Sequence, residues 1–392
     1  MLADNSSSLT PQPQEVATAV RPQRLTIGLP ASGSASERRF PLTPEAAAML
    51  NDSGCLVKIQ RGAAGVIHYS DNQYLKAGAA VVDRDEALAC DVVIHTAPIS
   101  VADIRKMRRG AMLLSLLNLH SQSAEAIKEL LRRHIIAVAL DLICDSNGHT
   151  PFHDILSEID GRAAIAVSSS LLAHPGHGKG ILLGGIAGII PCEVTIIGSG
   201  IAACAAASSA LGAGAMVRML DNDVYRLREA SHNVPGIITS ALHPRVIANA
   251  LRSADVVIAT DVTPSYTINS DMVDQMKRGV VVIDLNYDTA PMFPSLPGID
   301  MAMLPSDRSF GGRVCYTGVG NAVPRTAAMA LSNTLLSFMH DILSCDGVTN
   351  TVRLRPGLQR AVYTFLGKAV NHRIARLAGV REMDINLLLS CS

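Results

Sequence analysis

A short glycine-rich segment in the middle of the chain has the residue types and spacing of a dinucleotide-binding turn. The apolar run Val194–Ile197 is typical of a buried strand, and Gly198-Ser-Gly200-Ile-Ala-Ala203 follows it directly, a GxGxxA pattern. In such a turn the two glycines allow a tight bend and a close approach to a pyrophosphate, which the N-terminus of the next helix then faces. We therefore predict that a dinucleotide is bound by Gly198, Ser199, Gly200, Ile201 and Ala203.

An aspartate stands where the second strand of such a unit should end. Met216–Leu220 is the next strand-like run, and Asp221 follows it, 21 residues after Gly200. A carboxylate at this place hydrogen-bonds both ribose hydroxyls and repels a 2′-phosphate, so we expect NAD(H) rather than NADP(H) as the cofactor. The alternative is a Rossmann domain whose glycine-rich turn has lost its ligand.

The same segment has a second interpretation, as a membrane span. Val194–Val217 holds 24 residues without a charge, which is long enough to cross a bilayer. Sixteen of these residues are Gly, Ala, Ser or Cys, so a lipid-facing surface would be weakly apolar. Residues 1–23 have neither a signal-peptide nor an anchor pattern, and we predict a disordered leader there. We therefore expect no membrane partner.

The composition excludes several classes of protein. Lys+Arg and Asp+Glu number 34 each, so the chain has no basic field for nucleic acid. The eight cysteines are scattered without a CxxC pair, mostly in apolar runs, which is typical of reduced cysteines in a cytoplasmic protein. His174 and His177 have a spacing that can ligate a metal ion, but no third ligand is evident. We therefore predict neither a nucleic-acid partner nor a metal site.

Two series of alternating strands and helices must position these residues. Strand-like runs occur at Leu25–Leu29, Leu56–Ile59, Val81–Val82, Val92–Thr96, Met112–Leu117 and Ile135–Leu140, and then at Val194–Ile197, Met216–Leu220, Ile237–Ser240, Val256–Ala259 and Val280–Leu285. Helical patterns such as Ser123–Arg133 lie between them, and Thr43-Pro44 opens another. This alternation predicts an α/β fold with parallel sheets, and 392 residues exceed what one hydrophobic core holds.

Three longer helices are predicted outside these series. Asp154–Leu172 and Arg325–Leu343 stand at the two joints between the series. Leu358–Leu377 carries apolar residues at amphipathic spacing, which predicts a C-terminal helix with one solvated face.

Segments along the whole chain resemble the alanine dehydrogenase family, which includes the NAD-binding subunit of proton-translocating transhydrogenases. The matching segments are Arg39-Phe-Pro-Leu-Thr-Pro44, Ser157-Glu-Ile-Asp-Gly-Arg162, Gly178-Lys-Gly-Ile-Leu-Leu-Gly-Gly185, Val282-Ile-Asp-Leu-Asn-Tyr-Asp288, Ala322-Val-Pro-Arg-Thr326 and Gly367-Lys368. The resemblance implies two Rossmann-like domains, with an NAD-binding domain (153–324) inserted into a discontinuous substrate domain (24–152 plus 325–392). It also implies a homo-oligomer, commonly a hexamer.

The resemblance further implies an NAD-dependent oxidoreductase that interconverts a small L-amino acid with its 2-oxo acid and ammonia. Arg39 matches the family arginine that binds the substrate carboxylate, although it could be a surface arginine beside Arg38. Asp288 matches the family aspartate near the nicotinamide, although it could be a turn residue before Thr289. Ser157, in the matching segment of the first long helix, is predicted to contact the cofactor.

Two catalytic positions of the family are not matched. The family has a lysine just after the strand that corresponds to Val92–Ile94, where this chain reads His95-Thr-Ala-Pro98. The family histidine aligns with Asn118, and His120 lies two residues further on. The family asparagine is replaced by Gly318, with Asn321 three residues later. We predict that His95 replaces the lysine and that Asn118 or His120 replaces the histidine.

These departures leave three functions open. The first is a dehydrogenase for a small 2-amino or 2-oxo acid in which His95 or His120 is the acid–base group. The second is an NAD-binding homologue without dehydrogenase activity that acts as a sensor or an assembly partner. The third is an amino-acid deaminase that recycles its bound NAD.

Overall fold

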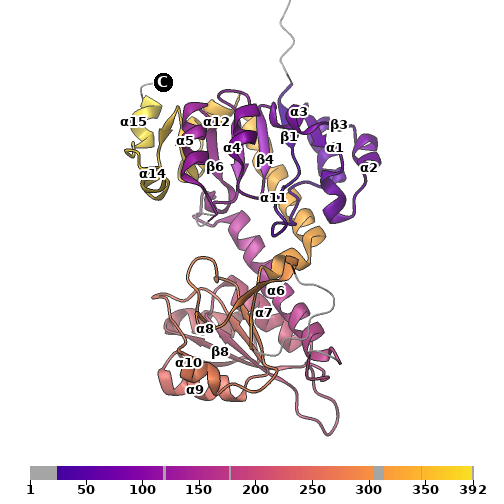
Figure 1. Cartoon of the computed structure of the whole chain (residues 1–392), viewed down its shortest axis with the longest axis vertical. Helices are drawn as coiled ribbons and strands as arrows, with labels where there is room; N and C mark the ends of the chain where they lie inside the picture. The colour runs from indigo at the N-terminus through magenta and orange to yellow at the C-terminus, as the bar shows by residue number, and fades with distance from the viewer. Residues whose placement is uncertain (1–23, 118–120, 176–177, 304–312, 346, 391–392) are drawn as a thin grey trace, which may run out of the picture.

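The chain forms two lobes that are connected by two long helices (Figure 1). The computed structural model describes residues 24–117, 121–175, 178–303, 313–345 and 347–390, so the predicted leader at 1–23 lies outside the described residues. The helix α6 (Pro151–Ala173) leads from the first lobe into the second, and α11 (Pro324–Ser344) leads back. The α/β fold of two Rossmann-like domains, one inserted into the other, is therefore confirmed.

The first lobe is built on an eight-stranded sheet with the order β15-β14-β6-β5-β4-β1-β2-β3. Its strands are β1 (Thr26–Leu29), β2 (Leu56–Gln60), β3 (Ala80–Val82), β4 (Val92–His95), β5 (Met112–Ser115), β6 (Ile136–Ala139), β14 (Val362–Phe365) and β15 (Lys368–Ala369). The first six strands pair in parallel, whereas β14 pairs antiparallel with β6 and with β15. These strands are apolar runs because helices cover both faces of the sheet.

Two hydrophobic cores lie on the two faces of this sheet, and the helices of the lobe divide between them. One core holds residues of α1 (Pro44–Asp52), α11 and the first turns of α6, and the other holds residues of α3 (Arg84–Leu88), α4 (Val101–Lys106), α5 (Ala124–Arg132) and α14 (His372–Ala378). The remaining helices are α2 (Asp71–Lys76), α12 (Val348–Leu354), α13 (Pro356–Gln359) and α15 (Ile385–Ser390), with 3-10 turns η1 (Ala63–Ile67) and η2 (Leu140–Leu142). Helix α1 begins as expected, because the Thr43 side chain accepts a hydrogen bond from the Ala46 N–H and Pro44 takes the first helical position.

The second lobe has a seven-stranded sheet with the order β12-β13-β11-β10-β7-β8-β9. Its strands are β7 (Glu193–Ile197), β8 (Met216–Asp221), β9 (Ile238–Ala241), β10 (Val256–Ala259), β11 (Val281–Asp284), β12 (Gly298–Asp300) and β13 (Cys315–Thr317), all in parallel pairings. Helices α7 (Ile201–Gly212) and α8 (Val224–Asn233) pack with α6 on one face, and α9 (Pro244–Ser253) and α10 (Ser270–Asp274) cover the other. Short 3-10 turns η3 (Met301–Met303) and η4 (Val319–Ala322) precede α11.

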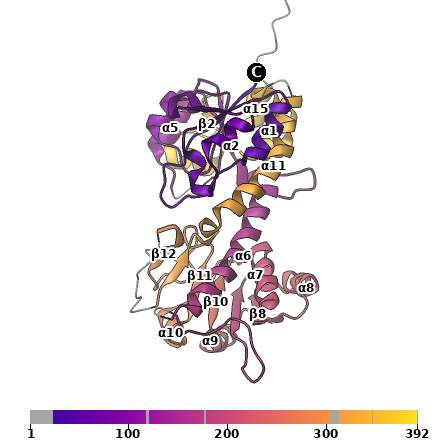
Figure 2. The same cartoon turned by 90° about the vertical axis from the view of Figure 1, so that its right-hand side faces the viewer.

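Helix α6 belongs to the cores of both lobes. Phe152 and Leu156, near its start, pack in the first lobe, whereas Ala163 and Ala164 pack in the second. Figure 2 shows α6 and α11 together between the lobes. The boundaries at 152/153 and 324/325 therefore fall within the first residues of the connecting helices, and we keep them as proposed boundaries.

The predicted amphipathic helix at Leu358–Leu377 is wrong. The structure has the short helix α13, the antiparallel pair β14–β15 and then α14. Leu366 and Gly367 between the strands both have positive φ, 47° and 76°, which is the geometry of a tight hairpin turn and ends any helix. The aromatic and β-branched run Val362-Tyr-Thr-Phe365 is buried against β6, where strand pairing outweighs the helical spacing of the apolar residues.

The segment with 24 uncharged residues is not one helix but β7, the fingerprint turn, α7 and the start of β8. No helix within the described ranges is long and apolar enough to cross a membrane. Nor do the described residues include a group of three or more metal-ligating side chains, and His177 lies outside them.

Candidate functional site in the cleft between the lobes

A cavity of about 520 Å³ opens between the two lobes. From the first lobe and α6 it is lined by Glu37, Arg39, Thr96, Leu116, Leu117, Asp141, His153, Asp154, Leu156, Ser157 and Asp160. From the second lobe it is lined by Gly200, Ile201, Ala202, Arg226, Thr260, Asp261, Leu285, Asn286, Asp288 and Thr289. Both sheets present their topological switch points here, β1/β4 from one and β7/β10 from the other, which is where open α/β sheets bind ligands.

The glycine-rich turn forms the wall on the second lobe. Gly198 has φ +107°, and a Cβ on it would lie 2.1 Å from Thr260 Oγ1 and 2.8 Å from the Asp261 carbonyl oxygen, so only glycine fits. Gly200 is the N-cap of α7 and has no side chain to bond the first N–H groups of that helix. Gly200 and Ile201 line the cavity, and Ala203 is fully buried against the strand side. These free N–H groups beside a glycine fit a pyrophosphate.

Asp221 lies beneath this turn rather than in the cavity. It is fully buried at the end of β8, where Oδ2 accepts a hydrogen bond from Ser199 Oγ at 2.5 Å and Oδ1 accepts one from the Asp223 N–H at 3.0 Å. The carboxylate is thus bonded within the protein, and the expected contact of Asp221 with the ribose hydroxyls stays a prediction. The visible role of Asp221 is to hold the second residue of the GxGxxA turn in place.

Arg39 forms the wall on the first lobe, together with Glu37. The Glu37 carboxylate accepts hydrogen bonds from Arg39 Nε at 2.8 Å and Nη2 at 2.5 Å. Burial alone lowers the pKa of the Arg39 guanidinium, but the negative charge and hydrogen bonds of Glu37, with Asp160 and Asp141 nearby, outweigh it and raise the pKa. Arg39 is thus a fixed cation, and its Nη1 has no hydrogen bond within the described part of the chain.

His95 does not reach the cavity. Its ring is buried, with Nδ1 2.6 Å from the Ala97 carbonyl oxygen and Nε2 3.3 Å from the Ala31 carbonyl oxygen. Burial lowers the pKa of His95, and both ring nitrogens face acceptors within the protein. The prediction that His95 replaces the family lysine is therefore not supported by its placement. Thr96 lines the cavity instead, and its hydroxyl donates to the Arg39 carbonyl oxygen at 3.0 Å.

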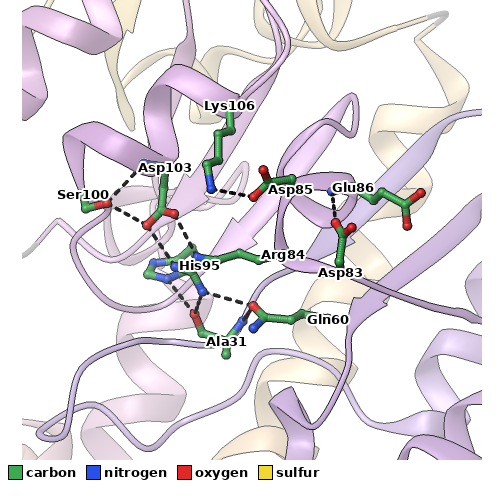
Figure 3. A network of polar contacts seen from close by, with 10 residues as sticks. All are labelled: Ala31, Gln60, Asp83, Arg84, Asp85, Glu86, His95, Ser100, Asp103 and Lys106. Carbon is green, nitrogen blue, oxygen red and sulfur yellow. Dashed lines mark hydrogen bonds and ion pairs between the residues drawn. The ribbon is translucent and has the colours of Figure 1, made fainter.

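A polar network around His95 fixes the loops that lead to the cavity (Figure 3). Arg84 donates two hydrogen bonds to the Asp103 carboxylate, at 2.8 and 2.9 Å, and others to Gln60 and to the Ala31 carbonyl oxygen. Ala31 follows β1 and His95 ends β4, so the network ties together the two loops from which Arg39 and Thr96 come.

Helix α6 contributes three polar groups, of which Ser157 and Asp160 lie in the segment that resembles the family and His153 precedes it. His153, Ser157 and Asp160 line the cavity at positions i, i+4 and i+7, which places them on one helix face, and His153 Nε2 is 3.4 Å from Ser157 Oγ. Burial raises the pKa of Asp160 to about 6, with Arg39 and His153 opposing the shift. Burial also raises the pKa of the neighbouring Asp141, which accepts the Leu117 N–H at 2.8 Å. The wall formed by α6 therefore offers the imidazole of His153 and the carboxyl group of Asp160, whose pKa is raised to about 6.

Asp288 lines the cavity from the second lobe, in the turn after β11. The turn is held by Asp284, whose carboxylate accepts the N–H groups of Asn286 at 2.9 Å and Met292 at 2.8 Å. Asp288 itself is exposed and lines the cavity with Leu285 and Asn286.

The sequence points to three further residues. Asn118 and His120 lie outside the described residues, and the buried Asn321 accepts the Arg38 N–H at 3.0 Å.

The chain matches two family models that together cover most of its length. The model described as "Alanine dehydrogenase/PNT, N-terminal domain" matches residues 28–159, and "Alanine dehydrogenase/PNT, C-terminal domain" matches residues 164–372. The chain is similar to the alanine dehydrogenase of Geobacillus stearothermophilus, with 29% identity over 93% of this chain and 100% of that protein. It is equally similar to an alanine dehydrogenase of Staphylococcus epidermidis, with 29% identity over 90% of this chain and 96% of that protein.

Solved structures show the same likeness. An L-alanine dehydrogenase superimposes with a TM-score of 0.81 and 25% identity, covering 90% of this chain and 99% of the other. A transhydrogenase from Sinorhizobium meliloti superimposes with a TM-score of 0.74 over 88% of this chain and 100% of the other, and at 19% identity it supports the fold alone.

Proposed function

Because the chain belongs to the alanine dehydrogenase/PNT family, we propose that it is an NAD-dependent oxidoreductase that interconverts a small L-amino acid with its 2-oxo acid and ammonia. The observation that carries the proposal is the cavity between the lobes. It combines the glycine-rich turn before α7, the fixed cation Arg39 and the carboxylate of Asp288.

We assign the cofactor to the second lobe. Gly198, Gly200 and the N-terminus of α7 would hold the pyrophosphate of NAD, Ile201 and Ser157 would contact it from the cavity walls, and Ser199 and Ala203 would support the turn. When bound, the nicotinamide accepts or supplies the hydride at the substrate C2 atom. The Arg226 guanidinium lies next to Gly200, where a Cβ would be 2.9 Å from Nη2, so it adds positive charge beside the turn.

We assign the substrate to the first-lobe side of the cavity. Arg39 Nη1 is the donor for the substrate carboxylate, because Glu37 occupies Nε and Nη2 and holds the guanidinium in one orientation. Asp288 follows β11 at the sheet edge where the nicotinamide and the reacting centre are expected. Reductive amination consumes one 2-oxo acid, one ammonium ion, one proton and one hydride, and it releases one water.

The acid–base group in this arrangement is His153. The hydroxyl that forms when ammonia adds to the 2-oxo carbon must take a proton before it leaves as water, and an imidazole within reach can serve as the general acid. His153 is the histidine that lines the cavity among the described residues, and it is flanked by Asp141 and Asp160.

His153→Gln is expected to lower kcat by about 10²-fold, the effect of losing a general acid. The Kd for NADH should stay unchanged, since the substitution does not touch the glycine-rich turn. His372→Gln, an exposed histidine at the start of α14, is the control and should have wild-type kcat. Stopped-flow or steady-state rates measure both variants. A kcat within threefold of wild type in His153→Gln contradicts the assignment.

The proposed function is tested with purified protein, NADH, ammonium and a panel of 2-oxo acids that includes pyruvate, glyoxylate and 2-oxobutyrate. We expect oxidation of NADH that needs both ammonium and one of these acids. No turnover above background, with NADH still bound in calorimetry, would favour the sensor alternative. Release of ammonia from an amino acid without net change in NADH would favour the deaminase alternative.

We also propose that the chain forms a homo-oligomer, with the hexamer implied by the family resemblance. An apolar loop after α6 supports self-association, because Leu182, Ile186, Ile189 and Ile190 are exposed on it and Ile190 is 85% exposed. Ile186 and Ile189 form a β-bridge that gives the loop a defined shape.

The described cysteines are free thiols, which fits the cytoplasmic location that we propose.

Ile190→Asp is expected to reduce the molar mass in light scattering after size-exclusion chromatography, because a charge in an apolar contact is costly. Leu75→Asp, a single exposed leucine on α2, is the control and should keep the wild-type mass. An unchanged oligomer in Ile190→Asp would show that the loop is not the contact.

A further inference from the structure

A carboxylate on the α6 wall of the cavity has no bonded partner among the described residues. Asp160 lines the cavity from α6 and forms no hydrogen bond or ion pair within the described part of the chain. It sits against the backbone of η4, because a Cβ on Gly320 would lie 2.0 Å from Asp160 Oδ1. Glycine at position 320 therefore leaves the space that this carboxylate fills. A half-buried carboxylate without a partner is unfavourable unless a ligand supplies one.

The charges around Asp160 define what kind of ligand fits. Among the positive charges, Arg39 has the largest effect on the pKa of Asp160, but its guanidinium already forms two hydrogen bonds to Glu37. Burial raises the pKa of Asp160 to about 6, and Glu37 adds to this rise, while Arg39 and His153 oppose it. Asp141 is a further carboxyl group near Arg39. A ligand that places a cation on Asp160 and an anion on Arg39 matches both groups.

We propose that Asp160 is the ammonium site of the cleft, binding the α-ammonium group of the amino acid and, in the reverse direction, the ammonium ion. In the substrate zwitterion the carboxylate and the ammonium nitrogen are both bonded to the C2 atom, so the two charges lie close together. Arg39 and Asp160 line one cavity and carry the opposite charges. Asp160 thus separates 2-amino acids from 2-hydroxy acids, which lack the cation. This inference rests on the proposed function and names a binding residue for it.

Ammonium binding at Asp160 should depend on pH in a defined direction. Above about pH 6 the group is a carboxylate and attracts the cation, and below it the group is neutral. The other groups that face it or influence its charge are His153 on the same helix and Glu37, Arg39 and Asp141 from the first lobe. The KM for ammonium of the wild-type enzyme should therefore fall as the pH rises from about 5 to about 7. In Asp160→Asn this dependence should disappear.

The test compares Asp160→Asn with Asp154→Asn, which removes the same charge from the same cavity wall. Asp154 is a matched control because its carboxylate already accepts the Thr150 hydroxyl at 2.9 Å. In Asp160→Asn we expect the KM for ammonium to rise by about 10- to 100-fold, as for a lost charge-assisted hydrogen bond. The KM for the 2-oxo acid and the Kd for NADH should not rise. Asp154→Asn should leave all three unchanged.

A second variant displaces the carboxylate and keeps its charge. Gly320→Ala should force the Asp160 side chain to turn, because the added Cβ meets its Oδ1 atom, and should raise the KM for ammonium as well. An unchanged KM for ammonium in Asp160→Asn, or an equal rise in both substrate KM values, overturns the proposal.

Binding without turnover keeps this proposal separate from the proposed function. Calorimetry on the protein saturated with NADH, in buffer without ammonium, compares L-alanine with pyruvate, because L-alanine needs NAD⁺ and pyruvate needs ammonium to react. We expect Asp160→Asn to lose affinity for L-alanine by about 10-fold or more and to keep its affinity for pyruvate. Equal affinities of the wild type and the variant for L-alanine, or no binding of L-alanine to the wild type, also overturn it. Absence of turnover with intact, Asp160-dependent L-alanine binding would contradict the proposed function alone.

Discussion

Gly198→Ala is expected to raise the Kd for NADH by about 10³-fold or more. The residue has φ +107°, where an L side chain is strained, and its Cβ would meet Thr260 Oγ1 at 2.1 Å and the Asp261 carbonyl oxygen at 2.8 Å. Thr260 cannot easily give way, because its N–H and its hydroxyl both donate to the Ile197 carbonyl oxygen, at 2.8 and 3.0 Å. The turn must therefore move away from the position in which it faces a pyrophosphate. We also expect a stability loss of about 2–4 kcal/mol.

Gly212→Ala is the matched control for this prediction. Gly212 ends α7, in the same lobe, and a Cβ on it has nothing within 4 Å. The substitution should leave the Kd for NADH unchanged and stabilise the helix by up to about 1 kcal/mol. Fluorescence titration gives the Kd, and circular dichroism confirms that each variant is folded at the titration temperature. Folded Gly198→Ala protein that binds NADH like the wild type would contradict the role of the turn.

Arg39→Ala is expected to lower kcat/KM for the 2-oxo acid by about 10³-fold. This is the cost of about 4 kcal/mol for removing a charge-assisted contact to the substrate while leaving the Glu37 carboxylate without its partner. The loss should appear mainly in KM, because the carboxylate is bound equally in the ground state and the transition state. The Kd for NADH should remain that of the wild type.

Two comparisons make the Arg39 result specific. Arg38→Ala removes the neighbouring arginine, which is exposed, and should change kcat/KM by less than about threefold. Arg39→Lys keeps the positive charge but not the planar fork, so it should recover only part of the activity. If Arg38→Ala and Arg39→Ala had equal effects, Arg39 would be the surface residue of the alternative interpretation.

The features that could be predicted from the sequence are those with a local physical cause. The strand before Gly198, the turn itself and the helix after it follow from glycine geometry and from apolar runs, and the N-cap Thr43 follows from its neighbour Pro44. The predicted helix at Leu358–Leu377 was wrong because the apolar spacing alone did not reveal the positive φ at Leu366 and Gly367. Gly367 inside the helical pattern is the local signal of a turn at this place, whereas the positive φ of Leu366 has no signal in the sequence.

The site could be predicted only where a motif or the family resemblance pointed to it. His95 stands in the sequence where the family has its lysine, but two backbone carbonyl oxygens bind its ring away from the cavity. The carboxylate of Asp221 bonds Ser199, a contact across 22 residues that depends on the packing of β7 against β8. His153 belongs to no motif, and Asp160 lies in the matching segment Ser157–Arg162 without an assigned role. Their importance follows from the helix face that α6 turns toward the cavity.

The central claim is that the cavity passes a hydride between the nicotinamide and the C2 atom of a substrate that carries an amino group. The most direct measurement uses two forms of NADH. Each form carries one deuterium at C4 of the nicotinamide, on one face of the ring in the first form and on the other face in the second. Each form is incubated with ammonium and the 2-oxo acid that reacts fastest, and the amino acid product is analysed by mass spectrometry. We predict one deuterium at C2 of the amino acid from one labelled form and none from the other. Formation of amino acid without deuterium from either form, or no amino acid while NADH is bound, would contradict the account.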